Sequence, residues 1–198
     1  WNQIMSLPRK LTMRSHDEIA QEPAGDIESL RGEHRHVGKT LLPANEEVVL
    51  EGIAGSAMEI TATIAAKELP MVEMNVLRSP GREEFTRISF FRERGYHNRG
   101  HREGGRQSLI SIDTAMSSLG ADVMSRAPET APVDIEPDED VTLRVFIDQS
   151  VVEVFVNDRQ CVAVRVYPDR EDSVGVSFRS QGQDAELLNL DAWQMKSI

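Results

Sequence analysis

Apolar and polar residues alternate with a period of two along most of the chain, and this pattern constrains the fold more than any other feature. Successive side chains of a β-strand point to opposite faces, so the alternation predicts strands with one buried face. Stripes with the 3.6-residue period of a helix are nearly absent. The alternation occurs in KLTMR (10–14), EEVVLEG (46–52), AMEITATIAA (57–66), MVEMNVLRS (71–79), FTRISFFRE (85–93), SLISIDTA (108–115), VTLRVFID (141–148), SVVEVFVND (150–158), QCVAVRVYP (160–168), SVGVSFRS (173–180) and AELLNLDAWQM (185–195).

About eleven short strands separated by turns predict an all-β fold, a two-sheet antiparallel β-sandwich of the jelly-roll or concanavalin-like type. A chain of 198 residues is long enough for one such domain with a sizeable core. Three segments interrupt the pattern. Residues 16–33 predict a loop with a turn of helix, 92–106 carry four glycines and predict a long exposed hairpin loop, and 125–140 carry three prolines and predict a stiff surface connection.

The composition excludes several classes of partner. The formal net charge of −11 repels a phosphate backbone, so nucleic acid is not an expected partner. No stretch approaches the roughly 18 apolar residues of a spanning helix, so no membrane contact is expected. A single cysteine, Cys161, excludes an intrachain disulfide, and its alternating surroundings predict a small buried apolar side chain.

Two carboxylates, Asp148 and Glu153, flank the turn DQS inside an otherwise apolar run. They could lie close enough for glycoside hydrolysis, which needs two carboxyl groups roughly 5–10 Å apart. The competing interpretation is that Asp148 caps the turn and Glu153 supports a three-stranded meander. Glu153 would then need an arginine or a backbone donor, or a covered interface, because an unpaired buried charge is costly. We favour this second interpretation.

The sequence gives weaker evidence for a metal site or a nucleotide site. The histidines of EHRH (His34, His36) and HNRGH (His97, His101) lie in polar sequence without a metal-binding spacing, so no metal site is expected. No glycine-rich nucleotide motif occurs, and no cofactor is expected.

Sugar binding is the remaining candidate function. It would use exposed rings and polar side chains, and the long glycine-rich loop offers Tyr96, His97 and Arg99 as a candidate carbohydrate site. The spacing around Trp193 predicts a core position for that ring instead.

Five segments, in this order, resemble the C-terminal module of glycoside hydrolase family 32, which contains invertases, inulinases and levanases. SLPRKLTM resembles the PReL strand that follows the family's catalytic domain, and IAQEPAGDIESLR resembles the next stretch. ISIDTAMSS resembles a D-x-S-x-S region, and LRVFIDQSVVEVFVNDRQCVAVRVYP resembles the signature vDxSxxEvFvNdG. GVSFRSQGQDAELLNLDAWQM resembles the closing strands. The chain departs from the pattern at Arg159, where glycine is usual, and at Gln149, where arginine is common.

The resemblance implies that this chain carries no catalytic residues. In the family a five-bladed β-propeller holds the nucleophile in N-D-P-N, a second aspartate in R-D-P and the acid/base glutamate in E-C, and none of these motifs occurs here. The parent enzyme is expected to be a β-fructofuranosidase that hydrolyses the fructosyl bonds of sucrose or fructans. Sucrose or fructan would contact this chain only through that parent.

The resemblance also predicts the organisation and the partners. Residues 1–198 are expected to form a single module, with 1–40 as a leading strand and linker-like segment from a missing N-terminal propeller and 41–198 as the sandwich. Trp1 at the start fits a cut between the two domains. The module is expected to stabilise the catalytic propeller and offers a candidate contact for a homo-oligomer. An extracellular or vacuolar location is favoured over a cytoplasmic one. The alternatives are a free-standing carbohydrate-binding module and an independent hydrolase that uses Asp148 and Glu153.

Overall fold

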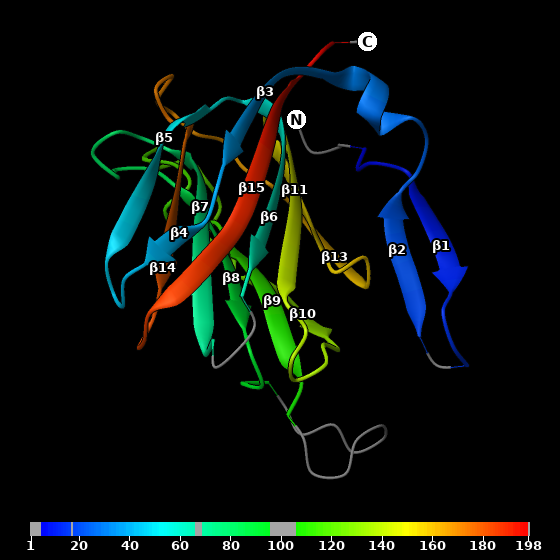
Figure 1. Cartoon of the computed structure of the whole chain (residues 1–198). Coiled ribbons are helices and arrows are strands. Elements are labelled where there is room, and N and C mark those ends of the chain that lie inside the picture. The colour runs from blue at the N-terminus through cyan, green and yellow to red at the C-terminus, as the bar shows by residue number, and fades with distance from the viewer. Residues whose placement is uncertain (1–4, 17, 66–68, 96–105, 198) are drawn as a thin grey trace.

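Two antiparallel β-sheets pack face to face, and a separate two-stranded hairpin stands beside them (Figure 1). The computed structural model describes residues 5–16, 18–65, 69–95 and 106–197. Every paired strand is antiparallel to its neighbour. The all-β sandwich predicted from the alternation is confirmed. Among the described residues no helix is long and apolar enough to cross a membrane.

The first sheet has seven strands: six lie in a continuous order, and the seventh, a short strand, pairs with one of them. The order is β13 (Gln160–Arg165), β12 (Val151–Val156), β11 (Val141–Asp148), β6 (Ala57–Ile64), β15 (Ala185–Met195) and β3 (Arg31–Val37), with β4 (Thr40–Leu42) beside β15. The meander of β11, β12 and β13 lies at one side of this sheet, so the signature segment forms three neighbouring strands. We call this the seven-stranded sheet.

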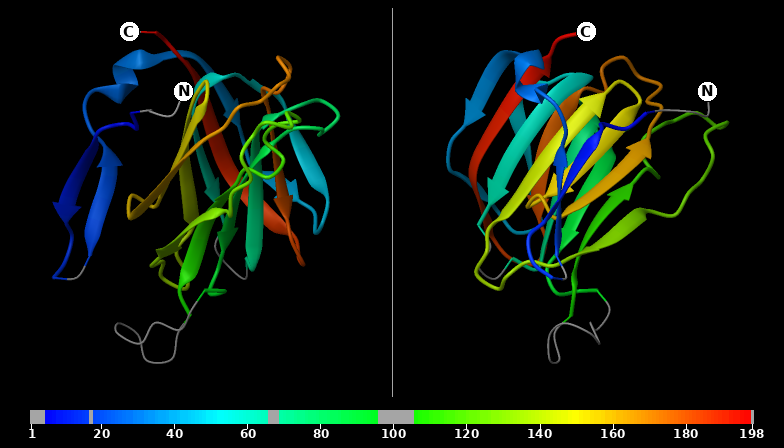
Figure 2. Two further views of the ribbon diagram at one scale, coloured as in Figure 1. Left: turned by 180° about the vertical axis from the view of Figure 1, so that it is seen from behind. Right: turned by 90° about the vertical axis from the view of Figure 1, so that its right-hand side faces the viewer.

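The second sheet has six strands. Their order is β10 (Glu129–Val133), β9 (Ser108–Asp113), β8 (Thr86–Phe91), β7 (Met71–Arg78), β14 (Gly175–Ser180) and β5 (Glu47–Ala54). Figure 2 shows the two sheets as layers with their strands running in similar directions. Such aligned packing is usual for sandwiches.

The core lies between the two layers and is built from the apolar residues of the alternating strands. Leu143, Val145 and Ile147 of β11 face it, as do Val152 and Val154 of β12, and all five are buried. Branched aliphatic side chains dominate this core, as the low aromatic content requires. Their burial is the main favourable contribution to folding, about 25 cal/mol per Å² of apolar surface.

The hairpin of β1 (Arg9–Met13) and β2 (Ile19–Pro23) belongs to neither layer. A 3₁₀ helix, η1 (Ile27–Leu30), follows it and leads into β3. In Figure 1 the hairpin stands apart from the sandwich, on the side of β11 and β13. The backbone N–H of Gln21 donates to the carbonyl of Asp158, which joins β2 to the turn between β12 and β13.

All eleven expected strands are present, and the structure adds β2, β3, β4 and β10. The prediction of a loop over 16–33 was wrong for β2 and for the start of β3, although the helical turn is present as η1. The connection predicted over 125–140 contains β10. Residues 31–37, which the sequence assigns to the leading segment, pair with β15 as β3. The added strands lie at sheet edges or pair outside the main order, where neither face must be fully buried, so their sequences lack clear alternation.

Candidate functional site

The outer face of the seven-stranded sheet carries the charged and aromatic residues of the signature region. Paired residues on neighbouring strands share a face. Arg144 on β11 pairs with Phe155 on β12 and with Thr61 on β6, and Thr61 pairs with Asp191 on β15. These four side chains therefore form one row across the face that points away from the core.

A buried carboxylate organises the middle of this face. Glu59 is fully buried and accepts hydrogen bonds from Arg31 at 2.8 and 2.7 Å and from Nε of Arg144 at 2.8 Å. Arg144 also donates to Glu28 at 3.0 Å. The hydrogen bonds to Glu59 are the main reason that the pKa of Arg31 is raised. A buried charge with several charge-assisted partners is satisfied, so both guanidinium groups are held in fixed positions.

The carboxylate pair of the sequence is divided between two environments. Glu153 is 3% exposed and accepts hydrogen bonds from the Leu7 backbone N–H at 2.7 Å and from Arg9 at 3.5 Å. Asp148 is exposed at the end of β11 and pairs in register with Val151. Glu153 thus anchors the segment before β1 to the sheet, and the prediction that it would have an arginine or backbone donor is confirmed.

A small apolar cluster surrounds this anchor. Ile27, Phe146, Phe155 and Cys161 are its buried members, and Leu7 packs against them. Burial raises the pKa of the Cys161 thiol to about 12, so the thiol stays protonated and unreactive at neutral pH. The prediction that Cys161 is a small buried side chain is confirmed.

Trp193 does not lie in the core, and that prediction was wrong. It lies on the outer face, where the Arg31 guanidinium sits 3.9 Å from the ring centroid and the His34 ring stacks at 5.0 Å. The alternation of β15 is real, but Ala192 rather than Trp193 is on the inner face. The aromatic ring is partly covered by its neighbours and does not fill the sandwich.

The two histidines of EHRH converge on one carboxylate. His34 Nε2 and His36 Nδ1 lie 2.7 and 3.0 Å from the same oxygen of Asp191. Desolvation raises the pKa of Asp191, but the hydrogen bonds from His36 and His34 outweigh it and the pKa is lowered. In the described parts of the chain no group of three or more histidine, cysteine, aspartate or glutamate side chains is arranged to hold a metal ion.

A groove of about 620 Å³ lies over this outer face. The strand residues that line it include Thr61, Arg144, Asp191 and Trp193. Its other lining comes from loops, namely Arg14 after β1, Glu139 and Asp140 before β11, and Asn157 and Asp158 after β12. The sequence analysis missed this groove, because its residues come from strands that are distant along the chain. The signal was a charged or hydroxyl residue at several outward positions of alternating strands, such as Thr61, Arg144 and Asp191.

The turn after β12 explains one departure from the family pattern. Positive φ angles occur at Asn157 (48°) and Asp158 (54°) and not at Arg159, so no glycine is required at position 159. Arg159 instead contacts Glu18 and Glu139, both at 2.6 Å. It therefore connects the loop of the β1–β2 hairpin to the sandwich. The candidate carbohydrate residues Tyr96, His97 and Arg99, and also His101, lie outside the described residues.

Comparisons with known proteins agree with the fold. The family model "Glycosyl hydrolases family 32 C terminal" matches residues 26–194. A β-fructofuranosidase of Daucus carota, insoluble isoenzyme 2, is 27% identical over all of this chain and 38% of its own length. Levanase of Bacillus subtilis is 28% identical over all of this chain and 28% of its own length. The crystal structure of fructan 1-exohydrolase IIa from Cichorium intybus has a TM-score of 0.83 at 22% identity, over 97% of this chain and 41% of that one.

The chain thus spans about two-fifths or less of the length of these relatives. The match to the family model covers most of the chain and includes both sheets of the sandwich. The resemblance inferred from the five sequence segments is confirmed. This chain belongs to glycosyl hydrolase family 32, and it is the C-terminal β-sandwich domain of that family.

Proposed function

We propose that residues 1–198 act as one non-catalytic module of a β-fructofuranosidase-type glycoside hydrolase and stabilise its catalytic propeller. The motifs that carry the family's catalytic carboxylates do not occur in the sequence. Glu153, the more buried of the two candidate carboxylates, is occupied by Leu7 and Arg9. Both observations support a role in holding the catalytic part rather than in bond cleavage.

The β1–β2 hairpin is the observation that carries this proposal. Leu11, Met13 and Ile19 are 64%, 64% and 47% exposed. Met13 pairs with Ile19, and Leu11 is two residues from Met13 on the same strand, so all three share one face. The hairpin also lies before residue 26, where the match to the C-terminal family model begins. An exposed apolar face on an element outside the sandwich is typical of an interaction surface.

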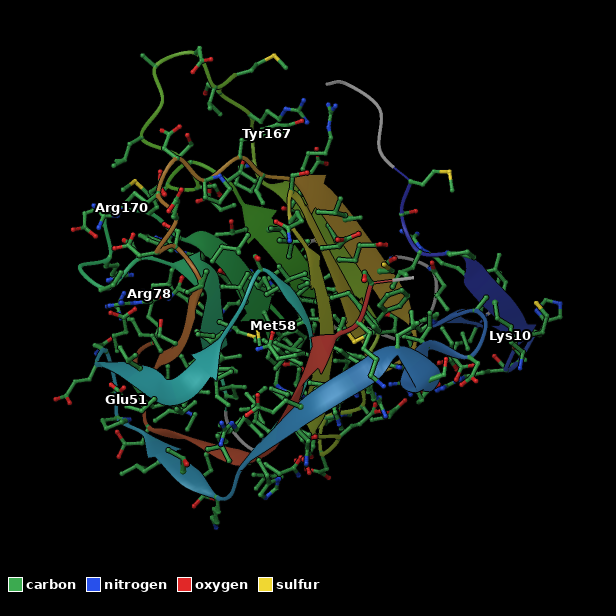
Figure 3. All side chains as sticks on the ribbon, turned by 90° about the horizontal axis from the view of Figure 1, so that it is seen from above. Lys10, Glu51, Met58, Arg78, Tyr167 and Arg170 are labelled. Carbon is green, nitrogen blue, oxygen red and sulfur yellow. The ribbon has the colours of Figure 1, made fainter. Side chains whose placement is uncertain are left out.

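The backbone of the hairpin supports the same conclusion. All five residues of β1 are exposed, and within the described structure β1 pairs only with β2. Figure 3 shows Lys10 of β1 at the margin of the molecule, far from Met58 in the core. A two-stranded hairpin alone is marginally stable in water, and an unpaired strand edge is a site for further pairing. The catalytic part would cover both the edge and the apolar face.

The hairpin is connected rigidly enough to transmit this contact. Glu153 anchors the chain just before β1, Arg159 contacts the hairpin loop at Glu18, and Gln21 pairs with Asp158. A partner bound to the hairpin would therefore be fixed relative to the sandwich. Pre-organisation of this kind lowers the conformational entropy lost on association.

The test joins this chain to the catalytic portion of the carrot β-fructofuranosidase, in place of that protein's own matched region, and measures sucrose hydrolysis during heating. Replacing Leu11, Met13 and Ile19 with serine should shorten the half-life of thermal inactivation at least about tenfold, because full burial of each apolar side chain contributes about 1.5–3 kcal/mol. The free 198-residue chain should release no fructose from sucrose.

Exposed apolar residues far from the hairpin provide the matched control. Leu119 and Met124 are 57% and 67% exposed in the loop after β9, and serine at both positions should leave the half-life unchanged. Equal half-lives for the hairpin variant and this control would contradict the proposal. Fructose release by the free chain that is lost in Glu153→Gln would instead support the independent hydrolase.

A further inference from the structure

The groove over the seven-stranded sheet has the size of a small-molecule site. Its volume of about 620 Å³ lies within the range of roughly 300–1,000 Å³ that is usual for ligand pockets. Its floor belongs to the sheet itself, because Thr61, Arg144 and Asp191 are neighbours in the strand register. A rigid sheet holds such a floor more precisely than loops would.

The polar groups on the floor are held in place before any ligand arrives. Arg144 is fixed by the fully buried Glu59 at 2.8 Å, and Asp191 is fixed by His34 and His36. The Thr61 hydroxyl, between them, makes no side-chain hydrogen bond to another described residue. Fixed donors and acceptors around a free hydroxyl group can bind a ligand at low cost in side-chain entropy.

The charges that line the groove nearly balance. Three arginines (Arg14, Arg31 and Arg144) face four acids (Glu139, Asp140, Asp158 and Asp191). A site for a polyanion such as a phosphorylated ligand would show an excess of arginine or lysine. A mixed set of donors and acceptors suits a neutral ligand that carries many hydroxyl groups, because each hydroxyl both donates and accepts.

From this geometry we propose that the groove binds a neutral oligosaccharide. Guanidinium groups donate to its hydroxyl oxygens, the carboxylates accept from its hydroxyl hydrogens, and Thr61 does either. Trp193 adds an apolar surface at the side of the groove. This site differs from the glycine-rich loop that the sequence suggested, and it does not depend on the catalytic part of a longer enzyme.

The experiment titrates the 198-residue chain with 1-kestose and, separately, with maltotriose, and follows binding by calorimetry and by amide NMR shifts. Saturable binding of at least one of them is expected. Thr61→Val keeps the β-branched shape but removes the hydroxyl, and Arg14→Ala removes one wall. Each variant should weaken binding about three- to tenfold, as expected for one lost hydrogen bond.

Thr130→Val is the matched control, because Thr130 lies on β10 in the other sheet, where its hydroxyl contacts Ser111. The Thr130→Val variant should bind the sugar with the same affinity as the unmodified chain. The sugar that binds more tightly, 1-kestose or maltotriose, identifies the preferred ligand. Binding of either sugar supports the site if Thr61→Val weakens that binding. The proposal is overturned if neither sugar saturates the chain, or if both variants bind as the control does. Neither outcome bears on the docking role of the hairpin.

Discussion

At the scale of single residues, buried carboxylates tie the loops of the six-stranded sheet together. Glu84 is fully buried and accepts hydrogen bonds from the backbone N–H groups of Leu119, Asp169 and Arg170 and from the Ser173 hydroxyl, at 2.7 to 3.0 Å. Burial raises the pKa of Glu84, but these hydrogen bonds outweigh it and the pKa is lowered. One carboxylate thereby fixes two loops that are distant in sequence.

Glu47, the first residue of β5 in that sheet, plays a similar part. Its carboxylate accepts two hydrogen bonds from Arg78, both at 2.9 Å, and one from Ser177 at 2.6 Å. The hydrogen bonds from Arg78 are the main cause that lowers the pKa of Glu47 to about 2. The charged form is therefore stabilised in the folded state.

The stability of the chain should fall in acid through Glu47. Because its pKa is lower in the folded state than its ordinary value of 4.5, its contribution is complete above that value and is lost as the pH falls toward about 2. Glu47→Gln should lower the free energy of unfolding at pH 7 by about 1–3 kcal/mol and flatten its decline in acid. Urea unfolding at several pH values measures both effects.

Glu51→Gln is the control, since Glu51 is exposed on the same strand (Figure 3). Equal acid dependence in both variants would show that the Arg78 pair does not produce the effect.

The same scale shows how far single residues could be predicted. Glu153 and Cys161 were predicted correctly because an apolar alternating strand leaves few environments for a charge or a thiol. Trp193 was misplaced because hydrophobicity alone cannot tell which face of a strand is inward when both faces carry apolar residues. The two side chains that cover the Trp193 ring, Arg31 and His34, come from β3, which is distant along the chain.

At the scale of elements, the strands with continuous apolar alternation form the centre of the sheets. β11 lies between β12 and β6, and its inward residues are buried. β3 and β10 escaped prediction because they are edge strands. β3 is exposed at most positions and reads as polar sequence, and β10 contains Pro132, which edge strands tolerate.

The central position of β11 leads to a quantitative expectation. Leu143 is 0% exposed, and Leu143→Ala should lower the free energy of unfolding by about 2–5 kcal/mol, because it removes apolar contacts and leaves a cavity. Leu119→Ala removes the same atoms from a side chain that is 57% exposed. It should therefore change the free energy of unfolding by less than about 0.5 kcal/mol. Denaturant unfolding of both variants measures the difference. Similar losses would mean that β11 is not part of the core.

At the scale of the whole molecule, the chain combines a closed sandwich with an open hairpin. The alternation could predict the sandwich because each strand needs one buried face. It could not predict the groove, because the register that joins β6, β11 and β15 brings together residues about 45 to 130 positions apart. The resemblance placed residues 1–40 outside the sandwich, but the pairing of β1 with β2 was not predictable, since the sequence of β2 lacks clear alternation.

An isolated chain with this surface should self-associate. At about 0.15 M salt, where charges are screened beyond about 8 Å, the net charge of −11 should not prevent contacts between hairpins. Sedimentation velocity should show a sedimentation coefficient that rises with concentration, and serine at Leu11, Met13 and Ile19 should abolish the rise. A chain that stays monomeric at every concentration would contradict this expectation.

The unpaired edge of β1 also bears on how such a protein is made. In the relatives the region matched here is the C-terminal part of a longer polypeptide, so the ribosome completes the catalytic part first. At a synthesis rate of roughly 5–20 residues per second, the hairpin would leave the exit tunnel within seconds of the catalytic part, on which we propose that it docks. Early docking of this kind would prevent the unpaired edge of β1 from pairing with neighbouring nascent chains.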